Sequence, residues 1–305
     1  MVKSVSVVIP AYKAQVFIHR PVTSVLQQTW TDWELVIASD DGVDYVQVLR
    51  EQGLSDPRLR CVFTRGVGTG AANARNTGLD AAEARTVATL DADDRFAPNA
   101  LEVLVPLARQ HGAAYSRPRF IDHATNEELE SLDRPLSSGP VTLEDILTSQ
   151  IHTYAGIVFD RSHVTARWPA WMQRWEDVFF YVHCFDDIDR MYHVAEPLYD
   201  YYRVGGSICN RPETGQEYLT WTSALEQRLE RGDELGLRNE ASRALFWRFL
   251  RSRHIIEAEF VEALATGQCH DFHSFTRLRR ELFYNLGPAP QPQAEAGASP
   301  ELSTA

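Results

Sequence analysis

Three carboxylates stand close together at Asp91, Asp93 and Asp94, directly after the apolar run Thr86–Leu90. Like charges at the tip of a buried strand repel one another, so such a cluster costs free energy unless a cation neutralises it. Carboxylate oxygens favour Mg²⁺ or Mn²⁺, and proteins commonly share these ions with the phosphates of a substrate. The sequence therefore predicts a divalent metal site here. The alternative is a solvated loop whose aspartates cap the helix after Pro98.

Polar residues also follow two earlier strand-like runs. The segment Pro10-Ala11-Tyr12 comes at the end of the β-branched run Ser4–Pro10, and Asp40-Asp41-Gly42 comes after Glu34–Ser39. Strands at this spacing, separated by segments long enough for helices, are typical of βαβ units on a parallel sheet. Such sheets bind ligands beyond the carboxyl ends of their strands. We therefore expect the three polar clusters at one edge of the sheet.

The rest of the pattern predicts an α/β protein with a helical end. From 216 to about 286 the chain is helical and charged in character, and 287–305 is rich in proline and alanine, which favours disorder. We expect one α/β domain over 1–212, with a first half at about 1–112 and a second at about 113–212, then a helical region over 213–286 and a disordered tail. Further strands are predicted at 59–63, 113–121, 157–159 and 193–202, and helices at 16–29, 71–84 and 178–185.

Five motifs in this order resemble those of the family 2 glycosyltransferases of GT-A fold. They are VSVVIPAY near the start, ELVIASDDG, GTGAANARNTGL, TLDADDRFAPNAL and Trp175-Glu176-Asp177, which is followed by Tyr201-Tyr202-Arg203 and Ser207. The resemblance covers about residues 3–210. It implies a Rossmann-like, mostly parallel sheet flanked by helices. It also implies an inverting enzyme that moves a sugar from a nucleotide diphosphate to a hydroxyl, without a protein nucleophile.

The resemblance gives the residues after the first strands roles in nucleotide binding. Pro10, Ala11 and Tyr12 would pack against the nucleotide. Asp40 would accept a hydrogen bond from uracil N3, with Asp41 as the rival for that role. The alternative for Asp41 is an Asx-type turn with the glycine that follows it.

The ARNxG motif contributes Arg75, which by resemblance lies close to the nucleotide and the acidic cluster. An arginine beside carboxylates would keep them ionised. The alternative is an arginine on the helix surface. The D-x-D of the family corresponds to Asp91 and Asp93, which would hold the metal, and Asp91 and Ala92 would also lie at the ribose-diphosphate. The metal would neutralise the diphosphate leaving group as the sugar C1–O bond breaks. Asp94 would assist the metal or cap the next helix.

The acidic pair Glu176-Asp177 resembles the family's acidic pair at the start of a helix in the acceptor half. Its second member, Asp177, is the expected general base, which takes the proton of the acceptor hydroxyl. The alternative is that both acids only stabilise the helix N-terminus. Arg203 and Ser207 resemble the loop that closes over the diphosphate. Many relatives carry a His between these two positions, which this sequence lacks.

Charge and hydropathy exclude other classes of protein. The chain has 30 Lys and Arg against 42 Asp and Glu, a net charge of −12, which argues against binding nucleic acid or an anionic membrane through bulk charge. No apolar run approaches the roughly 18 residues that span a bilayer. We expect a cytoplasmic protein and leave open a peripheral position at the inner membrane face. The amphipathic stretch at 245–253 leaves open a homo-oligomer formed through the C-terminal helices.

The sequence thus favours an inverting glycosyltransferase of polysaccharide biosynthesis that depends on Mn²⁺ or Mg²⁺. The expected donor is a UDP-sugar, and the expected acceptor is a hydroxyl of a saccharide or other polar compound. One alternative is a sugar-nucleotide nucleotidyltransferase, which is disfavoured because Ala11-Tyr12-Lys13-Ala14 lacks the glycines of their loop after the first strand. The other is a catalytically silent binding module of the same fold.

Overall fold

The computed structural model describes residues 3–129, 137–149, 156–204, 213–268 and 275. Its centre is a nine-stranded sheet of order β3-β2-β1-β4-β8-β6-β9-β5, with β7 paired to β9. The strands are β1 (Val5–Ala11), β2 (Trp33–Ser39), β3 (Leu59–Phe63), β4 (Thr86–Thr89), β5 (Arg95–Phe96), β6 (Ala113–Asp122), β7 (Gly139–Val141), β8 (Val158–Asp160) and β9 (Met191–Arg203). The helices are α1 (His19–Leu26), α2 (Tyr45–Glu51), α3 (Ala71–Ala81), α4 (Ala100–His111), α5 (Leu143–Ser149), α6 (Glu176–Cys184), α7 (Thr214–Glu230) and α8 (Glu240–Ala265).

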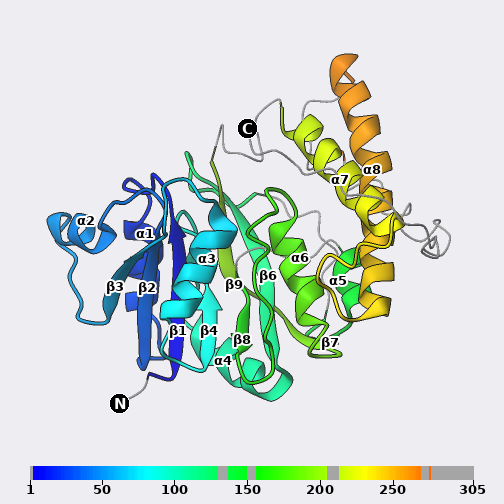
Figure 1. Ribbon diagram of the computed structural model, residues 1–305. Coiled ribbons are helices and arrows are strands. Elements are labelled where there is room, and N and C mark those ends of the chain that lie inside the picture. Colours follow the sequence, from blue (N-terminus) through cyan, green and yellow to red (C-terminus); the bar gives the residue numbers. More distant parts are fainter. Residues whose placement is uncertain (1–2, 130–136, 150–155, 205–212, 269–274, 276–305) are drawn as a thin grey trace.

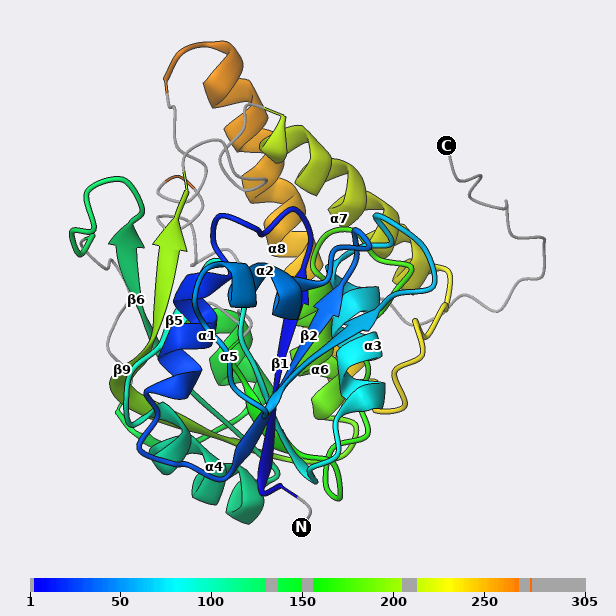
Figure 2. The same cartoon turned by 90° about the vertical axis from the view of Figure 1, so that its left-hand side faces the viewer.

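The first half of the sheet is parallel. β1 lies between β2 and β4, and β2 pairs with β3, all in the same direction. All seven residues of β2 are buried, as expected for a strand covered by helices on both faces. In the second half, β6 and β9 run side by side in parallel (Figure 2), whereas β8, β5 and β7 pair antiparallel to their neighbours. This mixed α/β sheet flanked by helices confirms the predicted fold class.

Each face of the sheet has its own hydrophobic core, because successive side chains of a strand point to opposite faces. Ile9 belongs to the core under α1, α2 and α4, whereas its neighbour Val8 belongs to the core under α3 and α6. Figure 1 shows α3 and α6 in front of the sheet. Helix α3 approaches β1 closely at Gly78, where a Cβ atom would lie 2.4 Å from Val8 Cγ1. The absence of a side chain at this position therefore sets how near α3 lies to the strands.

The predicted helical C-terminal region is present as α7 and α8, which pack against each other at the end of the molecule opposite β3 (Figure 1). Phe246 and Leu250 of α8 are fully buried in the same core as α6, so the pair is attached to the α/β domain by apolar packing. Among the residues that the structure describes, no helix combines the length and hydrophobicity needed to cross a membrane. The helical character predicted beyond 268 and the disordered tail predicted for 287–305 fall outside the described residues, apart from residue 275.

Candidate functional site

The carboxyl ends of β1, β2 and β4 meet at one edge of the sheet. Ala11 at the end of β1 pairs with Ser39 at the end of β2, and the Asp40 amide donates to the Ala11 carbonyl (2.8 Å). On the other side, the Leu90 amide after β4 donates to the Val8 carbonyl (3.0 Å). The segments that follow the three strands therefore leave the sheet together. The expectation that the polar clusters share one edge is confirmed.

Arg75 joins two acidic groups that are far apart in the sequence. From α3 its Nη2 donates to Asp91 Oδ1 (2.9 Å), and its Nη1 lies 2.8 Å from Asp177 Oδ1. The Arg75 side chain is only 4% exposed, whereas Asp91 and Asp177 are 24% and 26% exposed. Burial works against the charge of Arg75, but Asp177 and Asp91 outweigh it and raise its pKa, so the guanidinium stays protonated. The alternative of an arginine on the helix surface is wrong.

Asp177 lies in the first turn of α6 and has a perturbed acidity. Burial raises its pKa to about 7; Arg75 opposes this shift, and the negative charges of Glu176 and Asp91 add to it. The pKa of Glu176 is also raised, again mainly by burial. A carboxyl group with a pKa near neutrality can both accept and release a proton at physiological pH. This is the electrostatic setting that a general base requires.

Two of the three aspartates in the loop after β4 lie in different settings. Burial and then the charge of Asp91 raise the pKa of Asp93 to about 6, so this carboxylate gains from a nearby cation. Asp94 is 1% exposed and accepts hydrogen bonds from Tyr199 Oη (2.6 Å) and from the Tyr202 amide (2.7 Å). Asp94 therefore fixes the loop to β9. Within the described residues it caps no helix, so that part of the prediction is wrong.

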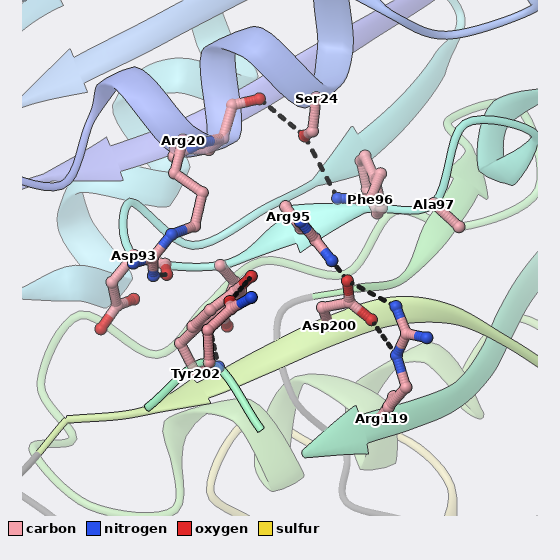
Figure 3. Close-up of polar contacts among 12 residues, drawn as sticks. Arg20, Ser24, Asp93, Arg95, Phe96, Ala97, Arg119, Asp200 and Tyr202 are labelled. Carbon is pink, nitrogen blue, oxygen red and sulfur yellow. Dashed lines mark hydrogen bonds and ion pairs between the residues drawn. The ribbon is translucent and has the colours of Figure 1, made fainter. Parts of the chain in front are cut away.

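Arg20 of α1 holds the same loop from its other side (Figure 3). Its Nη1 donates to the Asp93 carbonyl (2.6 Å), and its guanidinium carbon lies 3.6 Å from the centre of the Tyr202 ring. Its Nη2 lies 2.8 Å from His123 Nδ1. Sequence analysis missed Arg20 and His123, because their contacts join positions 103 residues apart and no local pattern indicates them.

Two ion pairs to the buried Asp200 fix the end of β9 beside this loop. Asp200 is 1% exposed, and Arg95 of β5 and Arg119 of β6 point toward it from either side (Figure 3). Arg95 Nε donates to Asp200 Oδ2 (2.5 Å) and Arg119 Nε to Oδ1 (2.7 Å). The three strands are thereby tied together two residues before Tyr202.

Asp40 is 3% exposed and holds the loop between β3 and α3. Its Oδ1 accepts hydrogen bonds from Thr64 Oγ1 (2.8 Å), the Thr69 amide (3.0 Å) and Thr69 Oγ1 (2.5 Å). Its Oδ2 accepts from the amide of Gly70 (2.8 Å), the residue that precedes α3. The predicted contact of Asp40 with uracil stays a prediction, and this carboxylate already binds four protein donors.

Asp41 is also engaged by its neighbours. Its Oδ1 accepts hydrogen bonds from Ser39 Oγ (3.1 Å) and from the Val43 amide (3.2 Å). The bond from the Val43 amide forms the Asx-type turn that was the alternative prediction for Asp41. Its Oδ2 accepts from the Lys13 amide (2.7 Å) and Tyr45 Oη (2.9 Å). Asp41 thus shapes the turn after β1.

The remaining predicted nucleotide-binding residues lie at the same edge or outside the described chain. Pro10 and Ala11 form the end of β1, Tyr12 follows them with 48% of its surface exposed, and Ala92 lies between the D-x-D aspartates. Arg203 ends β9 directly after Tyr202, with its guanidinium carbon 5.2 Å from the centre of the Phe120 ring. Ser207 lies outside the described residues.

The donor set at Asp91 and Asp93 fits a hard divalent cation. Both side chains offer carboxylate oxygens, and the pKa of Asp93 is raised by burial and then by the negative charge of Asp91. The described parts of the chain bring together no group of three or more His, Cys, Asp or Glu side chains that could hold a metal ion. A cation at the two aspartates would therefore take its other ligands from water and from a substrate, as Mg²⁺ commonly does.

Residues 6–162 match the family model described as glycosyl transferase family 2, which is about half of the chain. The chain belongs to this family.

Curated relatives of this glycosyl transferase family 2 member include two bacterial proteins. It is 35% identical over 111 residues to the UDP-Glc:alpha-D-GlcNAc-diphosphoundecaprenol beta-1,3-glucosyltransferase WfgD of Escherichia coli, covering 36% of this chain and 43% of the relative. It is 35% identical over 113 residues to the putative teichuronic acid biosynthesis glycosyltransferase TuaG of Bacillus subtilis, covering 37% and 44%. The matches therefore span less than half the length of these relatives.

Among solved structures, the fold is similar to that of S. aureus TarS 1-349 in complex with UDP-GlcNAc. The TM-score is 0.64, the sequence identity is 17%, and the match covers 83% of this chain and 72% of that chain. At this identity the likeness establishes the fold, which is the GT-A fold expected from the motifs.

Proposed function

We propose that this family 2 member is an inverting glycosyltransferase that moves a sugar from a nucleotide diphosphate to an acceptor hydroxyl. One observation carries the proposal: Arg75 binds both Asp91 of the D-x-D loop and Asp177 of α6. A donor diphosphate bound at the D-x-D loop would then lie close to Asp177, because Arg75 contacts both Asp91 and Asp177. The pKa of Asp177, about 7, suits a group that accepts a proton. The family membership agrees with this chemistry.

In the proposed reaction, Asp177 accepts the proton of the acceptor hydroxyl as its oxygen attacks C1 of the donor sugar. The new C1–O bond forms on the face opposite the leaving group, the bond from C1 to the diphosphate oxygen breaks, and the nucleoside diphosphate departs with the electron pair. Attack from the opposite face inverts the anomeric centre. Arg75 orients the Asp177 carboxylate during this step.

A divalent cation, Mn²⁺ or Mg²⁺, is proposed at Asp91 and Asp93, where it would neutralise charge on the leaving diphosphate. Pro10, Ala11 and Tyr12 would contact the nucleotide, and Asp40 or Asp41 would contact its base. A UDP-sugar donor is supported by the names of WfgD and of the TarS complex. The names of WfgD and TuaG also support a saccharide acceptor in polysaccharide biosynthesis.

The test measures UDP release and product formation with a panel of UDP-, GDP- and dTDP-sugars in the presence of Mn²⁺. Asp177→Asn is expected to bind UDP as tightly as the wild type in calorimetry but to lower kcat by about 10²-fold or more. The control is Asp80→Asn, the same change at a carboxylate of α3 that is 65% exposed and paired only at the surface. Full turnover by Asp177→Asn would contradict the assignment of the base.

Two further outcomes would contradict the proposed activity itself. Binding of nucleotide-sugars without transfer to any saccharide acceptor would favour the silent binding module. Formation of a nucleotide-sugar and pyrophosphate from a nucleoside triphosphate and a sugar phosphate would favour the nucleotidyltransferase. Proton NMR of the product linkage tests inversion, since the anomeric configuration of product and donor must then differ.

A further inference from the structure

Trp175, the residue directly before Glu176 and Asp177, has a left-handed backbone conformation with φ 67° and ψ 9°. For a non-glycine residue this conformation is unfavourable, and it persists only where the surroundings impose it. Trp175 is the N-cap of α6, but its side chain makes no capping hydrogen bond. The reason for the conformation must therefore lie in what the side chain contacts.

The Trp175 side chain is held between α7 and α8. Its indole Nε1 donates to Thr222 Oγ1 on α7 (2.9 Å). Its ring packs edge-to-face against Tyr218 of α7, with ring centres 4.8 Å apart, and against Phe249 of α8 at 5.2 Å. The Arg253 guanidinium carbon lies 4.9 Å from the ring centre. The C-terminal helices thus enclose the indole with both apolar and polar contacts.

The hydrogen bond made by the indole is the first of two consecutive hydrogen bonds, from Trp175 to Thr222 and from Thr222 to Glu257, whose donor and acceptor roles are fixed. An indole N–H can only donate, so the Thr222 oxygen must accept from Trp175. The hydroxyl hydrogen of Thr222 is then free to donate to Glu257 Oε2 (2.7 Å). Glu257 Oε1 also accepts from Arg253 Nε (3.2 Å). Thr222 and Glu257 are both fully buried, so water does not replace these partners.

This anchor acts at the start of the helix that presents Asp177. The Trp175 carbonyl accepts the first hydrogen bond of α6, from the Phe179 amide (2.7 Å). The direction of the first turn, and with it the place of Asp177 beside Arg75, follows from the backbone of Trp175. A relaxation of Trp175 to an extended conformation would rotate this turn and break the contact between Asp177 and Arg75.

We propose that Trp175 is a positioning residue that fixes Asp177 for proton transfer, and that the helices α7 and α8 act on the reaction through the Trp175–Thr222 hydrogen bond. The proposal rests on the proposed function of Asp177 and assigns a role in the reaction to the C-terminal helical region. It requires that kcat, rather than nucleotide binding, depends on a contact made on α7.

The test compares Trp175→Phe, which keeps an aromatic ring but removes the indole N–H, with Thr222→Val, which removes the hydroxyl at almost constant volume. Each is expected to lower kcat about tenfold or more, with the Kd for UDP and the donor KM changed less than twofold. The double variant is expected to be no worse than either single variant, because both changes break the same bond. Thr222→Ser, which keeps the hydroxyl, is expected to restore most of the activity.

The matched control is Thr220→Val, two residues along α7, where the hydroxyl is exposed and bonds only to the Gln216 carbonyl. It is expected to keep wild-type kcat. Circular dichroism and thermal melting test whether each variant is folded. If Trp175→Phe fails to fold, the comparison of kcat between Thr222→Val and Thr222→Ser decides the outcome. Wild-type kcat in folded Thr222→Val, or additive losses in the double variant, would overturn the proposal.

Asp177→Asn is assayed in parallel so that two failures can be told apart. Full activity of Asp177→Asn would contradict the base assignment and hence the proposed function. Loss of activity in Asp177→Asn together with unchanged kcat in Thr222→Val would contradict the positioning role alone.

Discussion

Glu257 on α8 is a buried acid whose ionisation is expected to weaken the fold as the pH rises. Burial raises its pKa from 4.5 to about 7, although Arg253, Thr222 and His254 all act in the opposite direction. In the unfolded chain the carboxyl group ionises near its ordinary value, whereas in the folded protein it keeps its proton up to about pH 7. The folded state therefore binds more protons between these two values, and stability must fall as the pH rises through this window.

The size of the effect follows from the two pKa values. A shift from 4.5 to about 7 corresponds to a contribution of about 2–3 kcal/mol that is present at pH 5 and lost by pH 8. Glu257→Gln has nearly the same shape and cannot ionise. Its free energy of unfolding should therefore equal that of the wild type within about 1 kcal/mol at pH 5 and exceed it by about 2 kcal/mol at pH 8.

The assay is urea denaturation of both proteins at pH 5, 6, 7 and 8, and the quantity to compare is the difference between them at each pH. This difference removes the contributions of those groups whose ionisation the substitution leaves unchanged. The control is Glu262→Gln, the same change at an exposed position of α8, which should follow the wild type at every pH. A difference that stays constant with pH, or a Gln variant that is less stable at pH 8, would refute the reasoning. Arg253 would then hold Glu257 ionised.

Three further changes test the fold and the proposed site. Gly78→Ala places a Cβ 2.4 Å from Val8 Cγ1 and should lower the free energy of unfolding by about 1–3 kcal/mol, whereas Gly139→Ala, with no atom within 4 Å, should be close to neutral in the same denaturation experiment. Asp40→Asn loses the acceptor for the Gly70 amide and should speed tryptic cleavage at the exposed Arg65, and an unchanged cleavage rate would argue that the loop is held by other contacts. Asp93→Asn should remove the Mn²⁺ dependence of UDP binding in calorimetry without altering the melting temperature by more than a few degrees, because the neighbouring Asp94 makes the buried contacts of this loop. Tight Mn²⁺-dependent binding by this variant would exclude Asp93 as a metal ligand.

Much of the fold could be predicted because its strands carry a strong local signal. The β-branched runs predict β1, β2, β3 and β4 to within a residue or two. Strand β5 has only two residues and exists through its pairing with β9, Arg95 with Asp200 and Phe96 with Tyr199. A pairing across about a hundred residues leaves no periodic pattern, so β5 could not be predicted. Helix α2 was also not predicted at its own position.

The site shows the same division between local and distant contacts. The sequence motifs single out four residues one by one, namely Asp91, Asp93, Asp177 and Arg75. They do not indicate that Arg75 binds two of the aspartates at once. That contact depends on the packing of α3 against α6, which neither segment encodes alone. No sequence pattern predicted the left-handed backbone conformation of Trp175, because only glycine, asparagine and aspartate commonly indicate this conformation. An association of copies through α7 and α8 stays a prediction.

The negative charges around Arg75 indicate that a donor diphosphate would need a cation in order to bind at this loop. Arg75 interacts with Asp177, Asp91 and Glu176, and its charge also acts on Asp93, so one guanidinium faces four carboxyl groups. A diphosphate brought to the same loop adds further negative charge, and Arg75 has both terminal amino groups engaged already. Repulsion would therefore oppose binding unless a cation joins the diphosphate to Asp91 and Asp93. With a cation in place, Arg75 can stay with Asp177. Under the proposed function, the same charge balance that disfavours a bare nucleotide would keep Asp177 ionised and oriented once the donor and the cation are bound.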